Sequence, residues 1–362
     1  MDTFAAPVGD GKADVYTMGT MTTSVGPPIA IVIPVYNGEK FIAEAMESAL
    51  AQTVAAEVVV LDDASTDGTA SVLRRYENSP GVAMHRLEQR VPAPAAWNQA
   101  IRRSRAPYFV VLAHDDLLDN EFIAAAQEEI RRWPEANLII FSYRTIDGLG
   151  HRRDEVRVDK YFAAPGRIDA RTYADRFCRW GQFFVPTSTV TRRACYERVG
   201  GFDEKLKVAY DWDFYLRAGA LGTDIILRKE VLASYRIHQT QSIVGHTSSD
   251  NGDSDLIFQK LGEIDKYLTQ EQMDWLVTSM CDFLRRTATS NLANPRVNPQ
   301  QLAEQRRQIR ATLEGWRSSG LPGADHVRLQ PNSWKQKLAW HLIGHPWAMC
   351  IFRGILSRIG RD

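Results

Sequence analysis

The sequence predicts an α/β fold, with a mainly parallel sheet flanked by helices and a mostly helical C-terminal appendage. Two observations lead to this class. Between residues 29 and 141, short apolar runs rich in β-branched residues recur, as in strands buried on both faces. Between these runs, apolar residues return at helical spacing. Strand and helix alternating at short spacing are typical of a parallel sheet.

Five apolar runs predict five strands, and each is followed by a break and, in most cases, a helical pattern. The strands are expected at 29–35, 57–61, 82–87, 108–112 and 137–141, and the helices at about 41–50, 69–76, 95–104 and 121–132. Asn37 is a candidate N-cap of the first helix and Asp67 of the second.

Beyond Arg144 the alternation loosens. We expect a helix at 211–220 and short strands at 225–227 and 231–235, and no internal repeat is found. The predicted organisation is a flexible N-terminal tail at 1–28, an α/β domain at 29–245 and a mostly helical region at 246–362. Methionines at positions 1, 18 and 21 are alternative start sites.

Composition excludes several classes of protein. Lysine plus arginine and aspartate plus glutamate each total 44, so the net charge is zero, which argues against a nucleic-acid binder. Four widely spaced cysteines without a C-x-x-C pair argue against a zinc ribbon or a disulfide framework. Free thiols and the lack of an N-terminal secretion signal predict a cytoplasmic location.

Acidic pairs follow two of the predicted strands. Asp62 and Asp63 follow the second strand, and Asp115 and Asp116 follow the fourth. In open α/β sheets, ligands bind beyond the carboxyl ends of the strands. Aspartates also cap helices and form turns, but two pairs at one sheet edge favour a binding site. A divalent cation that bridges carboxylates to phosphates fits such a set.

Familiar phosphate-binding and nucleophile motifs are absent from the sequence. It has no G-x-G-x-x-G, no G-x-x-x-x-G-K-[ST] and no G-x-S-x-G pattern, which disfavours a dinucleotide fold, a P-loop and a serine hydrolase. Without a glycine-rich cradle, a metal must neutralise any bound diphosphate.

Several segments together carry a resemblance to a known family. They are Ile31-Val-Ile-Pro-Val-Tyr-Asn-Gly38, Glu57-Val-Val-Val-Leu-Asp-Asp-Ala-Ser-Thr-Asp-Gly-Thr69, Ala113-His-Asp-Asp116, Val199-Gly-Gly-Phe-Asp-Glu204, Tyr210-Asp-Trp-Asp-Phe-Tyr-Leu-Arg217 and Tyr235-Arg-Ile-His238. Over about residues 29–245 the chain resembles a family 2 glycosyltransferase with the GT-A fold. The resemblance implies an enzyme that transfers a sugar from a nucleotide-sugar donor with inversion.

The resemblance also implies roles on the donor side. Pro34 and Tyr36 would line the nucleotide pocket, with Tyr36 stacked on the base. Asp63 would accept the imide N–H of uracil or thymine, which favours a UDP- or dTDP-sugar over a GDP-sugar. Asp62 would brace that loop, and Asn98 would hold the donor region.

On the reaction side, Asp115 and Asp116 match the positions that hold Mg²⁺ or Mn²⁺ against the diphosphate. Asp211 matches the general base. Trp212 and Tyr210 lie beside it and are expected on the acceptor side. The alternative for most of the neighbouring aromatics, which are Trp180, Phe183, Phe184, Phe214 and Tyr215, is burial in the core.

Two departures from the family pattern affect the site. Ala113 stands where the family's Asp-x-Asp-Asp motif begins, which makes Asp116 the expected direct metal ligand. His114 lies within the motif and either points aside or substitutes as a ligand. Tyr210 replaces the usual glutamate before the base. His238 is expected either to ligate the metal or to play a structural part.

Residues 334–359 contain three of the nine tryptophans together with basic side chains. This composition is typical of an interfacial helix and predicts peripheral contact with the inner face of the cytoplasmic membrane. A helix docked on the catalytic domain is the alternative. Membrane contact would suit a saccharide or lipid-linked acceptor in cell-envelope assembly. A non-catalytic sugar-nucleotide-binding relative and a sugar nucleotidyltransferase are the competing functions.

Overall fold

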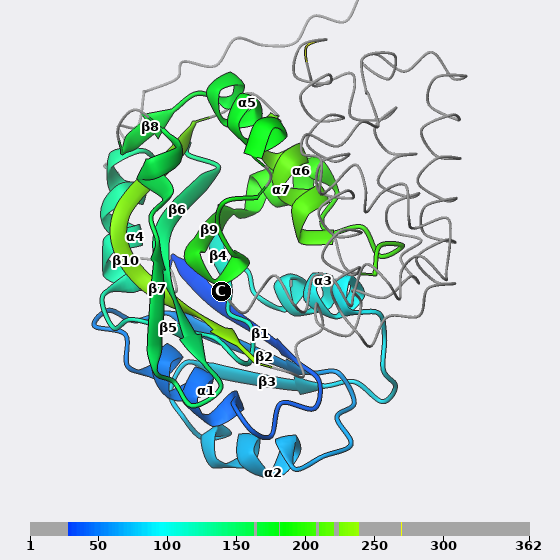
Figure 1. Ribbon diagram of the computed structural model, residues 1–362. Coiled ribbons are helices and arrows are strands. Elements are labelled where there is room, and N and C mark those ends of the chain that lie inside the picture. Colours follow the sequence, from blue (N-terminus) through cyan, green and yellow to red (C-terminus); the bar gives the residue numbers. More distant parts are fainter. Residues whose placement is uncertain are drawn as a thin grey trace, which may run out of the picture.

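The computed structural model describes residues 28–162, 165–180, 182–207, 210–220, 224–238 and 269 (Figure 1). The predicted N-terminal tail lies outside these residues. So do the start-site methionines and the Trp-rich segment at 334–359. The described part contains the whole predicted α/β domain up to His238, apart from short gaps.

The strands form one mixed sheet in the order β3-β2-β1-β4-β9-β6-β10-β5. One parallel part consists of β1 (Ile29–Val35), β2 (Glu57–Asp62), β3 (Val82–Arg86) and β4 (Tyr108–Val111), and β6 and β10 form a second parallel pair. The rest are β5 (Leu117–Leu118), β6 (Leu138–Asp147), β7 (Arg152–Val156), β8 (Gly166–Ile168), β9 (Thr189–Arg192) and β10 (Ile225–Ile237).

Helices cover both faces of this sheet. They are α1 (Ile42–Leu50), α2 (Thr69–Leu73), α3 (Ala93–Arg103), α4 (Phe122–Arg132), α5 (Ala170–Trp180), α6 (Arg193–Val199) and α7 (Tyr210–Ala220), with 3-10 turns η1 (Arg74–Tyr76), η2 (Val158–Tyr161) and η3 (Pro186–Ser188). Alternate residues of β1 face opposite sides of the sheet and so belong to two different hydrophobic cores. Ile31 lies in the core that includes residues of α1 and α4, and Val32 lies in the core that includes residues of α3, α5 and α7. Burial on both faces explains why the strand sequences are continuously apolar.

The α/β class and the order of the first elements are confirmed. The sheet is less parallel than predicted, because β9 lies antiparallel between β4 and β6. The two short strands predicted at 225–235 are one strand, β10, with register shifts against β6. Residues 147–180, which lack a clear period, contain η2 and α5.

Asn37 does not cap α1, contrary to the prediction. The helix begins at Ile42, and its N-cap residue, Phe41, makes no side-chain cap hydrogen bond. Asn37 instead adopts a left-handed φ of 50°, and its Oδ1 accepts a hydrogen bond from the Thr66 N–H at 2.8 Å. The residue therefore ties the loop after β1 to the loop after β2.

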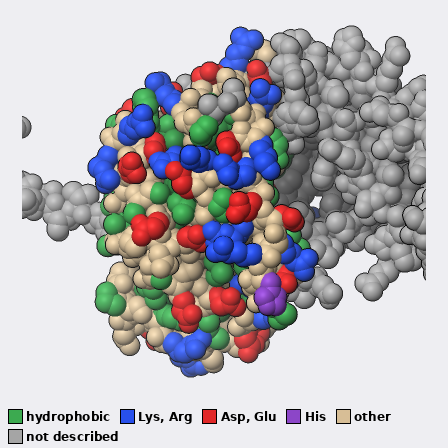
Figure 2. Space-filling view, turned by 60° about the vertical axis from the view of Figure 1, so that its left-hand side comes forward, with side chains coloured by type: hydrophobic (Ala, Val, Ile, Leu, Met, Phe, Trp, Pro, Cys, Tyr) green, Lys and Arg blue, Asp and Glu red, His purple; other side chains and the backbone are tan. Residues whose placement is uncertain are grey.

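The surface of the described part is mixed in charge. Figure 2 shows lysine, arginine, aspartate and glutamate side chains interspersed over one face. Within the described residues, no helix is long and apolar enough for a membrane crossing.

Candidate active site

The loops of the candidate site leave the carboxyl ends of three neighbouring parallel strands, β2, β1 and β4. The register pairs Val35 with Asp62, so β1 and β2 end side by side. Pro34 is buried in β1 opposite Leu61, beyond the last residue of β1 that pairs with β4. Proline fits there because no ladder hydrogen bond is required from its nitrogen.

Asp62 is buried at the end of β2 and is held from two sides. Its Oδ1 accepts the Ser65 N–H at 2.9 Å, and its Oδ2 pairs with Arg86 of β3. Ala64, which precedes Ser65 in this turn, has a left-handed φ of 54°. These contacts are those expected of a residue that braces the turn after β2.

Asp63 presents an acceptor at the sheet edge. Its backbone N–H donates to the Val35 carbonyl at 2.8 Å, and its Oδ1 accepts the Val91 N–H at 2.9 Å. Burial raises the pKa of the Asp63 carboxyl above its usual value, although Val91 and the charge of Arg90 oppose this shift. Among the described residues, Asp63 Oδ2 has no hydrogen-bond partner, which leaves an acceptor for a ligand.

Tyr36 lies next to Asp63 in the same corner. The Arg90 guanidinium carbon lies 3.9 Å from the centroid of the Tyr36 ring. One face of the aromatic ring is therefore covered by a cation, a favourable contact for an electron-rich ring. A base that stacks on Tyr36 must use the other face or displace Arg90.

Asp116 is fully enclosed in the loop after β4. Its Oδ2 accepts the Thr187 hydroxyl at 2.6 Å, and its Oδ1 accepts the Arg236 backbone N–H at 2.9 Å. Burial raises the pKa of Asp116 well above the usual value, and the charge of Asp115 adds to this effect. Both carboxylate oxygens of Asp116 thus accept hydrogen bonds from the protein, which gives the residue a supporting part in the loop, and its role as the direct metal ligand stays a prediction.

Asp115 faces His238. Its Oδ2 lies 2.8 Å from His238 Nε2, and both side chains are about nine-tenths buried. Burial alone would raise the pKa of Asp115, but the hydrogen bond from His238 and the charge of His114 keep it below the usual value. The His238 ring also packs on Phe41, at 4.8 Å between centroids.

Asp115 and His238 are of residue types that bind divalent cations, and in this structure they are hydrogen-bonded to each other. Within the described residues there is no cluster of three or more histidine, cysteine, aspartate or glutamate side chains suited to a metal. Mg²⁺, however, is usually held by one or two carboxylates together with substrate phosphates and water. Asp115 and His238 offer one carboxylate and one imidazole, so they fit a metal that is completed by a diphosphate.

His114 packs against the loop after β1. A Cβ atom placed on Gly38 would lie 2.6 Å from His114 Cδ2, so the imidazole packs directly on the glycine. Burial lowers the pKa of His114. Of the two alternatives for His114, the structure favours a packing residue.

Asp211 lies in the first turn of α7. Its Oδ1 accepts the Trp212 N–H at 2.8 Å, and its Oδ2 accepts Gln182 Nε2 at 3.4 Å. Burial raises the pKa of Asp211, which strengthens the carboxylate as a base. Gln182 lies five residues before Thr187, the partner of Asp116. This short segment therefore links Asp211 to the loop that carries Asp115.

Asn98 does not face the candidate donor region, contrary to the prediction. Its Nδ2 donates to the Phe202 carbonyl at 2.8 Å and to Glu204 Oε1 at 3.0 Å. Its Oδ1 accepts the Tyr196 hydroxyl at 2.8 Å and the Phe202 N–H at 3.0 Å. All four hydrogen-bonding positions of the amide are thus occupied. Asn98 clamps the Gly-Gly-Phe loop to α3, and Gly201 is required beside it because a Cβ there would lie 2.9 Å from Asn98 Oδ1.

We predict that Asn98→Ala destabilises the fold by about 3 kcal/mol, because it leaves several buried polar groups of Tyr196 and Phe202 unpaired. Urea unfolding followed by circular dichroism measures this change. Gln99→Ala, the next residue of α3, is the matched control and should cost under about 0.5 kcal/mol. Equal stability of the two variants, with loss of UDP binding in Asn98→Ala alone, would restore the donor-contact role.

Comparisons with known proteins bear on the domain that carries these loops. A model described as Glycosyl transferase family 2 matches residues 30–200, which include the loops of Asp63 and Asp115. These residues form a family 2 glycosyltransferase domain. The fold agrees as well. The crystal structure of S. aureus TarS 1–349 in complex with UDP-GlcNAc superposes with a TM-score of 0.67 at 16% identity, covering 92% of this chain and 91% of TarS 1–349. The domain has the GT-A fold.

Two relatives by sequence show the range of similarity. An uncharacterized glycosyltransferase of Rickettsia prowazekii (strain Madrid E) is 26% identical over 281 residues, which cover 76% of this chain and 84% of the relative. The succinoglycan biosynthesis protein ExoU of Rhizobium meliloti (strain 1021) is 32% identical over 211 residues, which cover 56% of this chain and 60% of ExoU.

Several aromatic residues lie near Asp211 on α7 and the neighbouring segments. Trp212 is partly buried, and its ring centroid lies 5.4 Å from that of Phe177. Tyr210 packs edge-on against Trp97 at 5.1 Å. The other described neighbours, which are Phe183, Phe184, Phe214 and Tyr215, are core residues. The side chain of Trp180 lies outside the described part of the chain.

Sequence reasoning missed three residues that hold the site together, Gln182, Thr187 and Arg236. Gln182 and Thr187 carry no local signal, since their partners are 29 and 71 residues away in the chain. Arg236 belongs to the Tyr-Arg-Ile-His segment that contributes to the family resemblance, but that resemblance did not indicate a role for the arginine.

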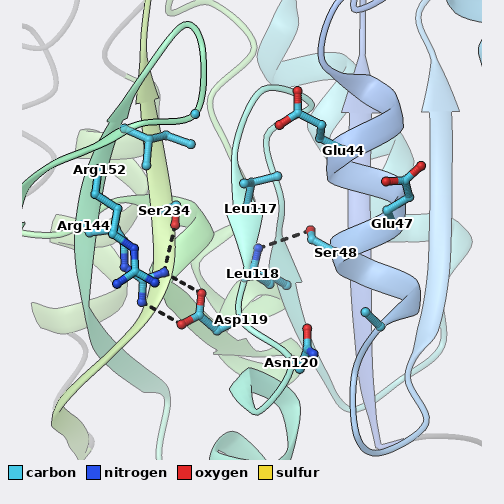
Figure 3. A pocket seen from close by; sticks show the side chains of 13 residues that line it. Glu44, Glu47, Ser48, Leu117, Leu118, Asp119, Asn120, Arg144, Arg152 and Ser234 are labelled. Atoms are coloured by element: carbon cyan, nitrogen blue, oxygen red, sulfur yellow. Dashed lines mark hydrogen bonds and ion pairs between the residues drawn. The ribbon is translucent and has the colours of Figure 1, made fainter.

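A separate cavity of about 410 Å³ lies between α1 and the strands β5, β6 and β10 (Figure 3). Its walls include Glu44, Glu47 and Ser48 of α1 and the ion pair of Arg144 with Asp119. Glu44 connects this cavity to the glycosyltransferase site, because its carboxylate also binds Arg236.

Proposed function

We propose that this protein transfers a sugar from a UDP- or dTDP-sugar to an acceptor hydroxyl, with inversion at the anomeric carbon. One observation carries the proposal. Asp211, a half-buried carboxylate whose pKa is raised by desolvation, is joined through the short segment from Gln182 to Thr187 to the loop of Asp115. A general base linked to the loop proposed to bind the diphosphate suits a reaction in which an acceptor hydroxyl displaces the nucleoside diphosphate directly.

Asp63 supports a pyrimidine donor. Its Oδ1 is held by the Val91 N–H, which fixes the carboxylate and leaves Oδ2 for the imide N–H of uracil or thymine. Tyr36 lies beside it and offers an aromatic surface for the base. The complex of TarS with UDP-GlcNAc shows that a protein of this fold binds a uridine donor.

Asp115 and His238 would hold Mg²⁺ or Mn²⁺ against the diphosphate. The bound cation would neutralise the charge that develops on the departing nucleoside diphosphate. Asp116 supports this loop from inside, through Thr187 and the Arg236 backbone.

Asp211 would take the proton of the acceptor hydroxyl as the hydroxyl oxygen attacks the anomeric carbon. The new C–O bond forms as the bond to the diphosphate oxygen breaks, and the proton remains on Asp211 Oδ until it passes to solvent. A single displacement of this kind inverts the anomeric centre. Gln182 orients the carboxylate for this transfer.

The acceptor is proposed to be a saccharide or a lipid-linked saccharide of cell-envelope polysaccharide assembly. The name of ExoU, a succinoglycan biosynthesis protein, supports this class. Trp212 and Tyr210 flank Asp211 and would contact the acceptor. Peripheral attachment at the inner face of the cytoplasmic membrane, through residues 334–359, belongs to the same proposal.

A nucleotide-release screen tests the function. We expect the purified chain, with Mn²⁺ and envelope lipids as acceptors, to release nucleoside diphosphate from a UDP- or dTDP-sugar and not from GDP-sugars. Pyrophosphate formation from a sugar phosphate and a nucleoside triphosphate would instead indicate a nucleotidyltransferase. Ala113 in the metal motif is compatible with a non-catalytic relative, and donor binding without release on every acceptor tested would support that reading.

A further inference from the structure

Arg236 is a charged side chain buried to 1% exposure at the centre of the candidate site. Its Nε donates to the Asp115 carbonyl at 2.7 Å, and one terminal nitrogen donates to Glu44 Oε2 of α1 at 2.8 Å. The guanidinium carbon lies 4.7 Å from the centroid of the Phe41 ring. The side chain thus bridges the loop after β4 and helix α1.

The backbone of the same residue holds the neighbouring aspartate. The Arg236 N–H donates to Asp116 Oδ1 at 2.9 Å, and His238, two residues further along, meets Asp115 Oδ2 at 2.8 Å. Arg236 therefore fixes the backbone of Asp115 and, through its own strand, the approach of His238.

We propose that Arg236 is a positioning residue that holds Asp115 and His238 as one divalent-cation site, with Glu44 as its anchor on α1. The inference rests on the proposed function, in which these two side chains bind a metal with the donor diphosphate. Arg236 itself touches neither the metal nor the donor in this scheme.

The cost of burying a guanidinium supports a fixed arrangement. A buried cation is strongly unfavourable unless charged and polar groups surround it with good geometry. The planar guanidinium of arginine can donate hydrogen bonds in two directions at once, here to the Asp115 carbonyl and to the Glu44 carboxylate. Lysine has a single ammonium group and cannot span both partners in this way.

A substitution at Glu44 tests the role of Arg236 without disturbing the hydrophobic core. Its side chain is 51% exposed and lines the cavity in Figure 3, so a change there leaves the packing of Arg236 largely intact. Glu47, one turn along α1, lines the same cavity but accepts from the Tyr76 hydroxyl instead of Arg236. Glu47→Gln is therefore a matched control for Glu44→Gln.

The experiment measures Mn²⁺ binding in the presence of UDP by electron paramagnetic resonance, with thermal unfolding as a second readout. We expect Arg236→Lys to weaken Mn²⁺ binding at least about tenfold, in the range of residues that orient metal ligands, and Glu44→Gln, which acts one step further away through Arg236, to weaken it less, about threefold. Glu47→Gln should melt within about 1 °C of the wild type and bind Mn²⁺ normally. Glu44→Gln, which removes the charged partner of the buried Arg236, should lower both the Mn²⁺ affinity and the melting temperature, the latter by a few degrees.

Several outcomes would overturn the proposal. These are wild-type Mn²⁺ affinity in both Glu44→Gln and Arg236→Lys, a loss of thermal stability without a loss of affinity, and a wild-type protein that binds no Mn²⁺ with UDP. The proposed function fails separately, if wild-type protein releases no nucleoside diphosphate from any donor while the Mn²⁺ affinities still fall in the expected order.

Discussion

Replacing Asp211 by asparagine should lower the transfer rate by about 10²–10⁴-fold, the usual contribution of a general base. Asparagine keeps the size of the side chain and an oxygen that can accept the Trp212 N–H, but it cannot take the acceptor proton. UDP should bind to the variant as it does to the wild type. Nucleoside diphosphate release and calorimetric titration with UDP measure the two properties on one preparation.

Asp154→Asn, on the exposed strand β7, controls for the loss of a carboxylate as such and should retain full activity. Near-normal turnover in Asp211→Asn would exclude Asp211 as the base. The pH profile gives a second check. Because burial raises the pKa of Asp211, wild-type kcat/KM should begin to fall, as the pH decreases, above the pH at which an ordinary aspartate protonates. This acid limb should be absent from the residual activity of Asp211→Asn.

Asp115→Asn should have the second large effect, with loss of Mn²⁺ binding and about a 10³-fold lower rate, because the leaving diphosphate would keep its charge unneutralised. Treatment of the wild type with EDTA should have a similar effect on rate, and added Mn²⁺ should restore it. The measurements are Mn²⁺ titration in the presence of UDP and nucleoside diphosphate release.

Asp116→Asn provides the comparison for this prediction. Both Asp116 oxygens bind the protein, so its replacement should reduce stability more than it reduces Mn²⁺ affinity. The opposite ranking, with Mn²⁺ binding lost in Asp116→Asn and retained in Asp115→Asn, would contradict the assignment of Asp115. Full activity after EDTA treatment would contradict the metal role of Asp115 and His238.

Much of the fold could be predicted because its signals are local. The strands β1, β2 and β4 are buried on both faces, so their sequences are continuously apolar and easily recognised. The helices α1, α3 and α4 show apolar residues at helical spacing within 11 residues or fewer. The stretch before α5 could not be assigned, because strand β7 within it is polar and largely exposed, so its sequence carries no apolar period.

The sequence by itself determined which residue types reach the sheet edge. Asp62, Asp63, Asp115 and Asp116 follow strands, and the parallel order of β2, β1 and β4 brings the ends of those strands together. The motifs also placed the chain in the family that the comparisons confirm for residues 30–200. These inferences need only the order of residues along the chain and the regular geometry of a parallel sheet.

Only the tertiary structure decided what each side chain faces. Asp116 turns inward to Thr187, Asn98 is occupied by the loop at Phe202, and Asp115 meets His238 across 123 positions of sequence. Adjacent residues of one loop have similar sequence signals, but whether a carboxylate meets a protein donor or remains available to a ligand depends on segments that fold against it from elsewhere. Hydrogen bonds between distant segments leave no periodic trace, so their partners emerge only when the chain is packed.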